Sequence, residues 1–97
     1  MPKRFFVYIM ANRRNGTIYT GVTNALAARI MQHKDGQGSV FTRRYGLGML
    51  VYYEVHESIS QAIQRESNIK HWSRKWKFDL IEAENPQWRD LFDEIDG

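Results

Sequence analysis

Residues 5–22, "FFVYIMANRRNGTIYTGV", carry the pattern from which the architecture follows. The two ends of this stretch, 5–11 and 17–22, are rich in β-branched and aromatic residues, which favour β-strands. Between them, Asn15-Gly16 is a strong signal for a tight hairpin turn. The stretch therefore predicts two antiparallel strands joined by a hairpin.

Further along the chain, the pattern predicts one helix, a loop and a third strand. Residues 25–34 have helical spacing of apolar side chains, with Asn24 as the expected N-cap and an end near Asp35-Gly36. Residues 36–48 contain four glycines and no sustained period, which indicates a loop. The segment "MLVYYEV" (49–55) is the expected third strand.

The C-terminal half is expected to be helical. Ser58 begins a capping-box pattern, and the helix that follows is predicted to run to about Trp72. Ser73 caps a second predicted helix, which ends where Asn85 precedes a proline. Residues 87–96 suggest a short helix whose apolar side chains dock on the core, with a frayed acidic end. These docking side chains are Trp88, Leu91 and Phe92.

This order of elements, ββαβαα plus a short C-terminal helix, predicts an α+β fold in which helices flank a three-stranded antiparallel sheet. With 97 residues, 42% of them hydrophobic, the chain is expected to form a single domain, 1–97, with a core over about 5–93 and a frayed tail at 94–97.

Composition excludes several classes of site and location. The chain has no cysteine, which rules out disulfides, a thiolate zinc site and a thiol nucleophile. The apolar run Phe5 to Ala11 is too short to span a bilayer and lacks the features of a signal peptide. We therefore expect a cytoplasmic protein with no membrane association.

Charge is distributed unevenly along the chain. Residues 1–78 contain 13 Lys and Arg but only four acidic residues, whereas residues 79–97 contain one Arg and seven acidic residues. A basic body attracts polyanions, so nucleic acid is the first partner to consider, although surface charge that only maintains solubility explains the total equally well.

Glu66 is out of place on its predicted helix. At 100° per residue it projects about 40° from Ala62 and about 60° from Ile69, within the apolar stripe. A carboxylate facing a core requires a partner, either a cation or a metal. From the residues alone, a structural ion pair with Arg29 is the favoured interpretation.

Arg29 and His33 are separated by four residues on the first predicted helix, so they lie side by side. Tyr8 and Tyr19 lie on the two paired strands. If this helix covers the face that carries the tyrosines, all four groups converge on one patch.

In this arrangement the sequence resembles the GIY-YIG endonuclease superfamily, and specifically its small stand-alone bacterial members, which are related to the nuclease domain of bacterial excinuclease. "FVY" (6–8) and "YTG" (19–21) correspond to the two signatures, and the resemblance covers roughly residues 5–93. The resemblance implies an active site composed of Tyr8, Tyr19, Arg29, His33, Glu66 and Asn85.

Three positions depart from the family pattern. Phe6 replaces the glycine of the first signature and Thr20 the isoleucine of the second. Both positions are structural rather than chemical. Val22 stands where some relatives have a lysine, so that cationic role is unfilled or moved to the loop.

The resemblance also implies a chemistry. Glu66 is expected to hold one divalent ion, Mg²⁺ or Mn²⁺, and Arg29 to stabilise charge on the phosphate. Tyr8 is expected to be the general base, with its pKa lowered by nearby cations, while Tyr19 and His33 orient water and proton. Taken singly, most of these tyrosines and histidines are better explained as ordinary packing residues, whereas the set at family spacing favours the functional interpretation.

Two segments interleave aromatic and basic residues, "FTRRYG" (41–46) and "KHWSRKWK" (70–77). Trp72 and Trp76 are four residues apart, and core packing is the favoured role for both rings. The expected contacts to the nucleic-acid backbone are Arg43, Arg44, Arg74, Lys75 and Lys77.

The leading hypothesis is a metal-dependent endonuclease acting on DNA, structured or damaged, in repair or recombination. A nucleic-acid-binding module of a repair complex with little or no cleavage activity is the main alternative, and a protein-interaction domain is a third. No motif in the sequence identifies a particular protein partner.

Overall fold

A three-stranded antiparallel sheet with the order β2-β1-β3 forms the centre of the molecule. β1 (Phe5–Ala11) pairs with β2 (Ile18–Thr23) on one side and with β3 (Met49–His56) on the other. The predicted hairpin and third strand are confirmed. Each of the two later strands ends one residue beyond its predicted end.

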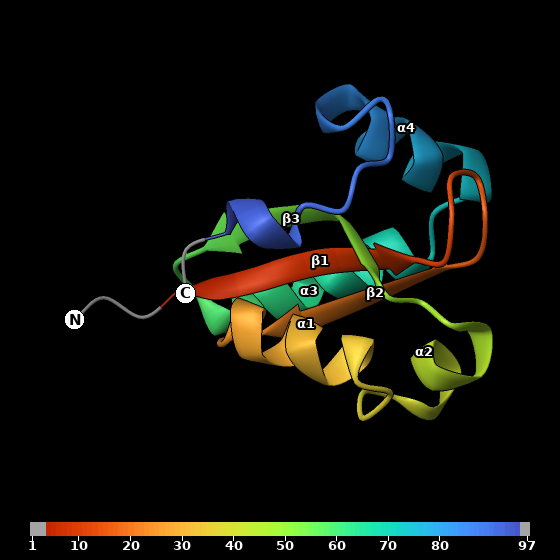
Figure 1. Ribbon diagram of the computed structural model, residues 1–97. Helices are drawn as coiled ribbons and strands as arrows, with labels where there is room; N and C mark the ends of the chain where they lie inside the picture. The colour runs from red at the N-terminus through yellow and green to blue at the C-terminus, as the bar shows by residue number, and fades with distance from the viewer. Residues whose placement is uncertain (1–3, 96–97) are drawn as a thin grey trace.

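The computed structural model describes residues 4–95, and helices cover both faces of the sheet (Figure 1). The α+β class predicted from the sequence is confirmed. In chain order the helices are α1 (Leu26–Lys34), α2 (Val40–Tyr45), α3 (Ile59–Lys70), α4 (Arg74–Glu84) and a 3-10 helix, η1 (Phe92–Glu94).

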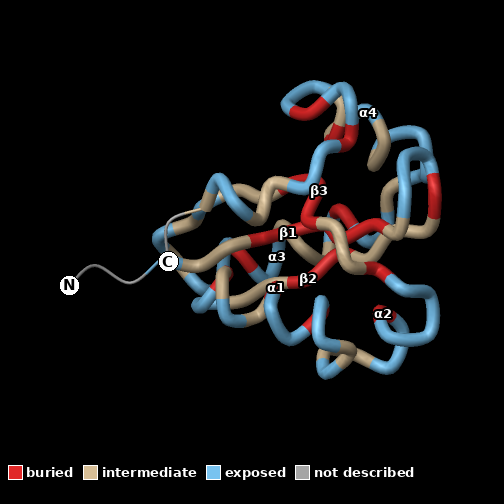
Figure 2. Tube along the Cα trace, in the orientation of Figure 1, coloured by how far each residue is buried: buried red, intermediate tan, exposed pale blue. Residues whose placement is uncertain are grey.

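The central strand β1 feeds two cores, because successive side chains of a strand point to opposite faces. The side chains of Val7, Ile9 and Ala11 point to the face of the sheet that α3 and α4 cover. Tyr8 and Met10 point to the other face, which α1 covers. All five side chains are buried, and Figure 2 shows this stretch of β1 at the centre of the molecule. Burial on both faces explains a strand that is apolar throughout.

The segment predicted as a loop, 36–48, contains the helix α2. Ser39 is its N-cap, with Oγ accepting a hydrogen bond from the backbone N–H of Thr42 at 3.0 Å. Gly46 ends the helix in the left-handed conformation, with φ 65°. A helix of six residues is too short to give a recognisable period, so the glycines on either side dominated the sequence pattern.

The start of α1 also differs from the prediction. Its N-cap is Ala25 rather than Asn24, and no side chain caps it. The Thr23 hydroxyl instead accepts a hydrogen bond from the N–H of Ala25 at 3.1 Å. Asn24 is exposed in the turn between β2 and α1.

The serine caps of the next two helices are confirmed. Ser58 Oγ accepts from the N–H of Gln61 at the start of α3, and Ser73 Oγ accepts from the N–H of Trp76 at the start of α4. α3 ends at Lys70, two residues before the predicted end, and α4 gives way at Asn85 as expected.

The C-terminal segment is mostly irregular, so the helix predicted over 87–96 is wrong except for η1. The side chain of Asn85 organises this segment: Nδ2 donates to the carbonyls of Val51 and Arg89, and Oδ1 accepts from the N–H of Arg89. These bonds close a turn that places Trp88 in the core at a positive φ of 56°. The docking predicted for Trp88 is confirmed.

Leu91 and Phe92 are partly buried against the second core, as expected. Of the tail predicted to fray, residues 96–97 lie outside the described range. Over residues 4–95, none of the helices combines the length and the apolar character that a bilayer crossing requires.

Replacing Asn85 with Ala should lower the free energy of unfolding by about 2–4 kcal/mol, because buried backbone groups lose their partners. Urea unfolding followed by circular dichroism would measure this loss. The neighbouring exposed substitution Gln87→Ala should change stability by less than about 0.5 kcal/mol. Equal stability of the two variants would contradict the role given to Asn85.

Candidate active site

The position of Tyr8 depends on Gly21, its partner across the β1–β2 pair. A Cβ atom at Gly21 would lie 2.5 Å from the phenol oxygen of Tyr8. The ring of Tyr8 therefore passes directly over the glycine. Gly21 lies inside β2, two residues before its end.

Behind Tyr8, a chain of buried hydrogen bonds connects three elements. The phenol oxygen lies 2.9 Å from Nε2 of His33, and Nδ1 of His33 lies 3.0 Å from Oγ1 of Thr42 on α2. The Thr42 hydroxyl donates its only proton to the carbonyl of Ser39. It must therefore accept from Nδ1–H of His33, which leaves Nε2 to accept the proton of Tyr8.

The ring of His33 needs a second glycine. A Cβ atom at Gly38 would collide with Nδ1 and the adjacent ring carbons of His33. Gly38 lies between α1 and α2, so the connection packs its bare backbone against the imidazole. Only 3% of His33 is exposed.

Burial sets the protonation of both partners. It lowers the pKa of His33 to about 4, with the nearby Arg29 guanidinium acting in the same direction. Burial raises the pKa of Tyr8, and the charges of Tyr19 and Glu66 add to this effect, whereas Arg29 opposes it. The expected net lowering of the pKa of Tyr8 is thus wrong: at neutral pH the pair consists of a phenol and a neutral imidazole.

Aromatic rings surround this pair. The ring centroid of Tyr19 lies 6.5 Å from that of Tyr8 and 5.7 Å from that of His33. Phe41 of α2 packs on Tyr19 at 6.1 Å. Tyr8, Tyr19 and His33 therefore do converge, as the sequence predicted.

Arg29 and Glu66 complete the group, but not as an ion pair. Glu66 Oε2 lies 3.0 Å from Nζ of Lys70, one turn later on α3. Arg29 donates to the side chain of Gln32 at 3.0 Å and lies close enough to Tyr8 to oppose the rise of its pKa. The structural pair expected between Glu66 and Arg29 is replaced by a pair within α3.

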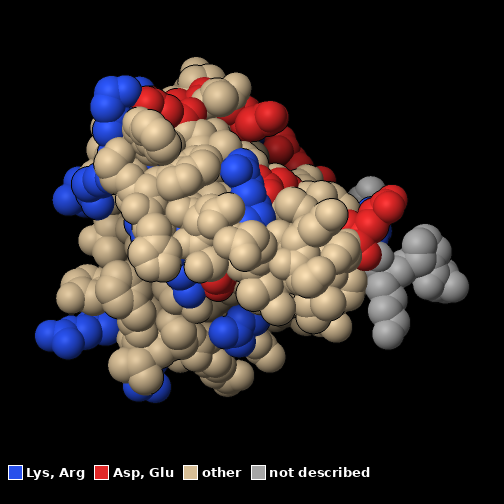
Figure 3. All heavy atoms as spheres, turned by 180° about the vertical axis from the view of Figure 1, so that it is seen from behind, with Lys and Arg blue, Asp and Glu red and all other residues tan. Residues whose placement is uncertain are grey.

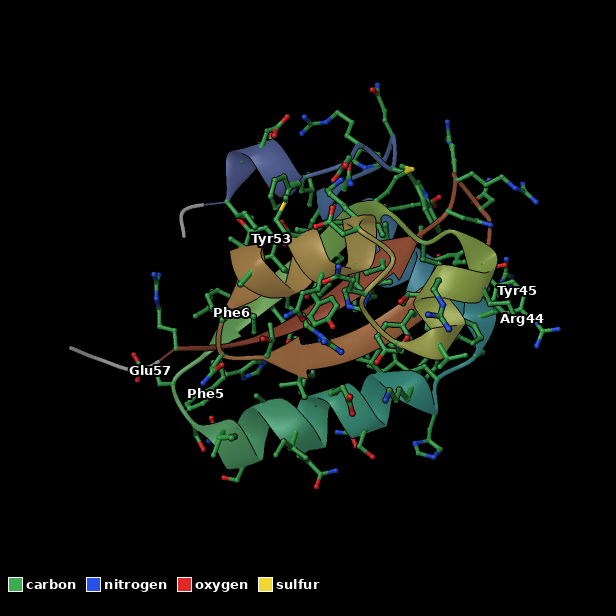
Figure 4. The ribbon with its side chains drawn as sticks, turned by 60° about the horizontal axis from the view of Figure 1, so that its bottom comes forward. Phe5, Phe6, Arg44, Tyr45, Tyr53 and Glu57 are labelled. Carbon is green, nitrogen blue, oxygen red and sulfur yellow. The ribbon has the colours of Figure 1, made fainter. Side chains whose placement is uncertain are left out.

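Glu66 also lies less deep than predicted. Ala62 and Ile69 of the same stripe are fully buried, whereas the Glu66 side chain is 16% exposed at the edge of the helix. Its charge nevertheless contributes to the pKa of Tyr8, which places it near the phenol. Figure 4 shows α1 and α3 on either side of β2, with side chains filling the space between them.

Asn85 does not join this group. Its hydrogen bonds all go to backbone atoms of Val51 and Arg89, on the side of the sheet that α4 covers. The amide is therefore placed to support the C-terminal turn.

The cations predicted to contact nucleic acid lie on two helices. Arg43 and Arg44 are exposed on α2, and Figure 4 shows Arg44 and Tyr45 at its outer end. On α4, Arg74 donates to two backbone carbonyls of the β1–β2 turn, Lys75 pairs with Asp79, and Lys77 is half-buried. Arg74 and Lys75 therefore make contacts within the protein in addition to carrying positive charge.

The two neighbouring tryptophans differ in burial. Trp72 packs partly against the first core, with its ring 5.9 Å from that of Trp76. Trp76 is 61% exposed, so the core position expected for its ring is wrong.

A metal at this site would have one protein carboxylate. Over residues 4–95, no group of three or more His, Asp or Glu side chains is arranged to enclose an ion. Glu66 offers a partly exposed carboxylate to the space beside Tyr8 and Tyr19. A single carboxylate suits a hard cation that keeps most of its ligands as water.

Comparison with known proteins agrees with this arrangement. The sequence model of the GIY-YIG catalytic domain matches residues 4–79. The chain belongs to the GIY-YIG nuclease family. The resemblance stated from Tyr8, Tyr19, Arg29, His33 and Glu66 is confirmed at the level of the family.

Several small GIY-YIG relatives carry the name UPF0213. One from Staphylococcus haemolyticus is 39% identical over 79 residues, covering 81% of this chain and 95% of its own. Another from Staphylococcus aureus is 40% identical over 76 residues, covering 78% and 92%. The solution NMR structure of a UPF0213 protein from Bacillus halodurans has a TM-score of 0.57 at 31% identity, covering 91% of this chain and 93% of that one.

Sequence reasoning missed two residues of the site, Thr42 and Lys70. Thr42 was hidden because α2 was interpreted as loop. Lys70 had a usable signal, since it follows Glu66 by four residues on the same helix and so had to lie beside it.

Substituting Gly21 with Ala should displace Tyr8 and destabilise the fold by about 1–3 kcal/mol, because the new methyl group meets the ring. Gly48→Ala is the matched control, since nothing lies within 4 Å of a Cβ at that position. Denaturant unfolding of both variants would decide. A Gly21→Ala variant as stable as wild type would show that the ring does not need this space.

The imidazole of His33 should titrate near pH 4 rather than near its ordinary value of 6.5. The unfolded chain then binds the proton more readily, so His33 contributes stability above pH 6.5 that is lost as pH falls towards 4. NMR titration of the ring nitrogens would measure the pKa and show Nδ1 protonated at neutral pH. A midpoint near 6.5, or a proton on Nε2, would contradict the hydrogen-bond chain.

Proposed function

We propose that this protein is a divalent-metal-dependent endonuclease that hydrolyses phosphodiester bonds of DNA. The observation that carries the proposal is the buried chain from Tyr8 through His33 to Thr42. At the Tyr8 end of this chain, the charges of Arg29 and Glu66 act on the phenol. A phenol bonded to a neutral imidazole has a defined path for a proton, and ordinary core packing does not require one.

Water activation is assigned to Tyr8 with His33 behind it. As water attacks the phosphorus atom, its proton passes to the Tyr8 oxygen while the phenol proton passes to Nε2 of His33. The imidazolium that forms keeps its Nδ1–H bond to Thr42. This relay needs no free phenolate, which agrees with burial raising the pKa of Tyr8.

Charge on the phosphate is assigned to Arg29. Its guanidinium is permanently protonated and forked, which suits two non-bridging oxygens of one phosphate. Tyr19, whose ring is tilted against those of both Tyr8 and His33, orients the attacking water.

Glu66 would hold one Mg²⁺ or Mn²⁺ ion. Such an ion supplies charge neutralisation and assistance to the leaving oxygen. Neutralising Glu66 would also remove one of the charges that raise the pKa of Tyr8, which favours release of the phenol proton to Nε2 of His33.

The charge pattern supports DNA as the substrate. Figure 3 shows the face of the molecule that is turned away from the viewer in Figure 1. On this face, Lys and Arg side chains lie over the left and lower parts, and acidic side chains gather at the upper right. Arg43 and Arg44 are exposed on α2, the helix whose Phe41 packs on Tyr19. Both are proposed contacts to the DNA backbone, together with Arg74, Lys75 and Lys77 of α4. Structured or damaged DNA in repair or recombination is the proposed context, in the cytoplasm.

A nicking assay on plasmid and branched DNA with Mg²⁺ or Mn²⁺ tests the proposal. Glu66→Gln, Tyr8→Phe and Arg29→Ala should each lower the rate by at least about 100-fold, because each removes a group that acts in the transition state. Glu57→Gln is the control for lost charge: Glu57 is exposed and lies at the opposite end of the molecule from Arg44 (Figure 4).

Folded variants that retain metal-dependent cleavage would remove their residues from the mechanism. Wild-type protein that binds DNA without cutting it, under all these conditions, would replace the nuclease with a binding module.

A further inference from the structure

The contact between Lys70 and Glu66 has no part in the mechanism above. Both residues lie on α3, one turn apart, and Nζ of Lys70 is 3.0 Å from Oε2 of Glu66. The Lys70 side chain is 45% exposed, whereas that of Glu66 is mostly covered. The ammonium group thus approaches the carboxylate from the open side of the site.

A second contact fixes the direction of this ammonium group. Nζ of Lys70 lies 5.8 Å from the ring centroid of Tyr19, within the range of a cation–π interaction. Lys70 is therefore held between the carboxylate and one of the aromatic rings of the site, rather than extending freely along the helix.

We infer that Lys70 and the divalent cation compete for the Glu66 carboxylate, and that the displaced ammonium group binds a phosphate oxygen of the substrate. The inference rests on the proposed function. An ion such as Mg²⁺ lies about 2.1 Å from a carboxylate oxygen. Because Nζ of Lys70 lies 3.0 Å from the same oxygen, the ammonium group would be very close to the bound ion. Two like charges so close repel, and one of them must leave.

The displaced ammonium group stays on the substrate side of the site, because its stem is anchored at the end of α3 beside Tyr19. A phosphate there would draw Lys70 away from Glu66 and so favour metal binding. By linkage, bound metal would favour phosphate binding to the same degree. Lys70 then fills the cationic role that Val22 leaves open at the second signature.

The chain contains a matched control for this pair. Arg89 and Glu94 form an ion pair of the same length in the C-terminal segment, with Nη1 3.0 Å from Oε1, but their side chains are 59% and 50% exposed. Neither residue belongs to the proposed site or to the proposed contacts with DNA. Removing the charge of Arg89 changes the net charge of the protein by the same amount without freeing Glu66.

The test is Mn²⁺ affinity without nucleic acid, measured by electron paramagnetic resonance of free Mn²⁺ at low ionic strength. Lys70→Met keeps an unbranched side chain and should bind Mn²⁺ about three- to tenfold more tightly than wild type, because the competing charge is gone. Arg89→Met should bind Mn²⁺ as wild type does, and binding by Lys70→Arg should remain weak. Glu66→Gln defines the site by abolishing it.

A Glu66-dependent site of equal strength in wild type and Lys70→Met would overturn the inference and leave the nuclease proposal intact. Absence of any Glu66-dependent site in both proteins would overturn the inference together with the metal assignment.

Binding of duplex DNA tests the second half of the inference. In a Tyr8→Phe background with Mg²⁺, adding Lys70→Met should lower the slope of log affinity against log salt by about one, as the loss of one phosphate contact predicts. The same slope with and without Lys70 would remove the lysine from the substrate.

Discussion

The hydrogen bond between the Tyr8 phenol and the His33 imidazole is the constraint on which the site depends. It joins the central strand to α1 in a place where both groups are buried, so each must satisfy the other. The bond forms only because two glycines leave room, Gly21 under the phenol and Gly38 beside the imidazole. Both positions are therefore restricted to glycine, although a strand or loop normally accepts other small residues.

This hydrogen bond belongs to a chain that determines which atom carries each proton. Thr42 gives its hydroxyl proton to a backbone carbonyl and can only accept from the imidazole, which fixes the tautomer of His33. Burial keeps the imidazole neutral and the phenol protonated. The short helix α2 thus contributes to the site, since it supplies the residue that orients the His33 imidazole.

The charged groups of the site, Arg29 and Glu66, act on the pKa of Tyr8 and are less enclosed than the phenol. Glu66 is at the edge of α3, where its carboxylate pairs with Lys70 and its charge acts on the phenol of Tyr8. Arg29 approaches from α1. A buried proton relay next to accessible charges is a suitable arrangement for a polyanionic substrate, because the relay is kept from water while the phosphate stays within reach of cations.

The sequence by itself determined the sheet, the serine-capped helices α3 and α4, and the ordered set of Tyr8, Tyr19, Arg29, His33 and Glu66. The β-branched and aromatic content of strands, capping residues and family spacing are local signals, and they do not depend on how the elements pack. What only the tertiary structure decided are relations between distant segments: the ring of Tyr8 over Gly21, Thr42 behind His33, and Asn85 bonded to the backbone of β3 and the C-terminal turn. The exposure of Trp76 and the lack of an ion pair between Glu66 and Arg29 belong to the same class, whereas the pair of Glu66 with Lys70 had a local signal in their spacing on one helix. These depend on how two helices and a strand meet in space, and residue spacing along one chain segment does not encode that distance.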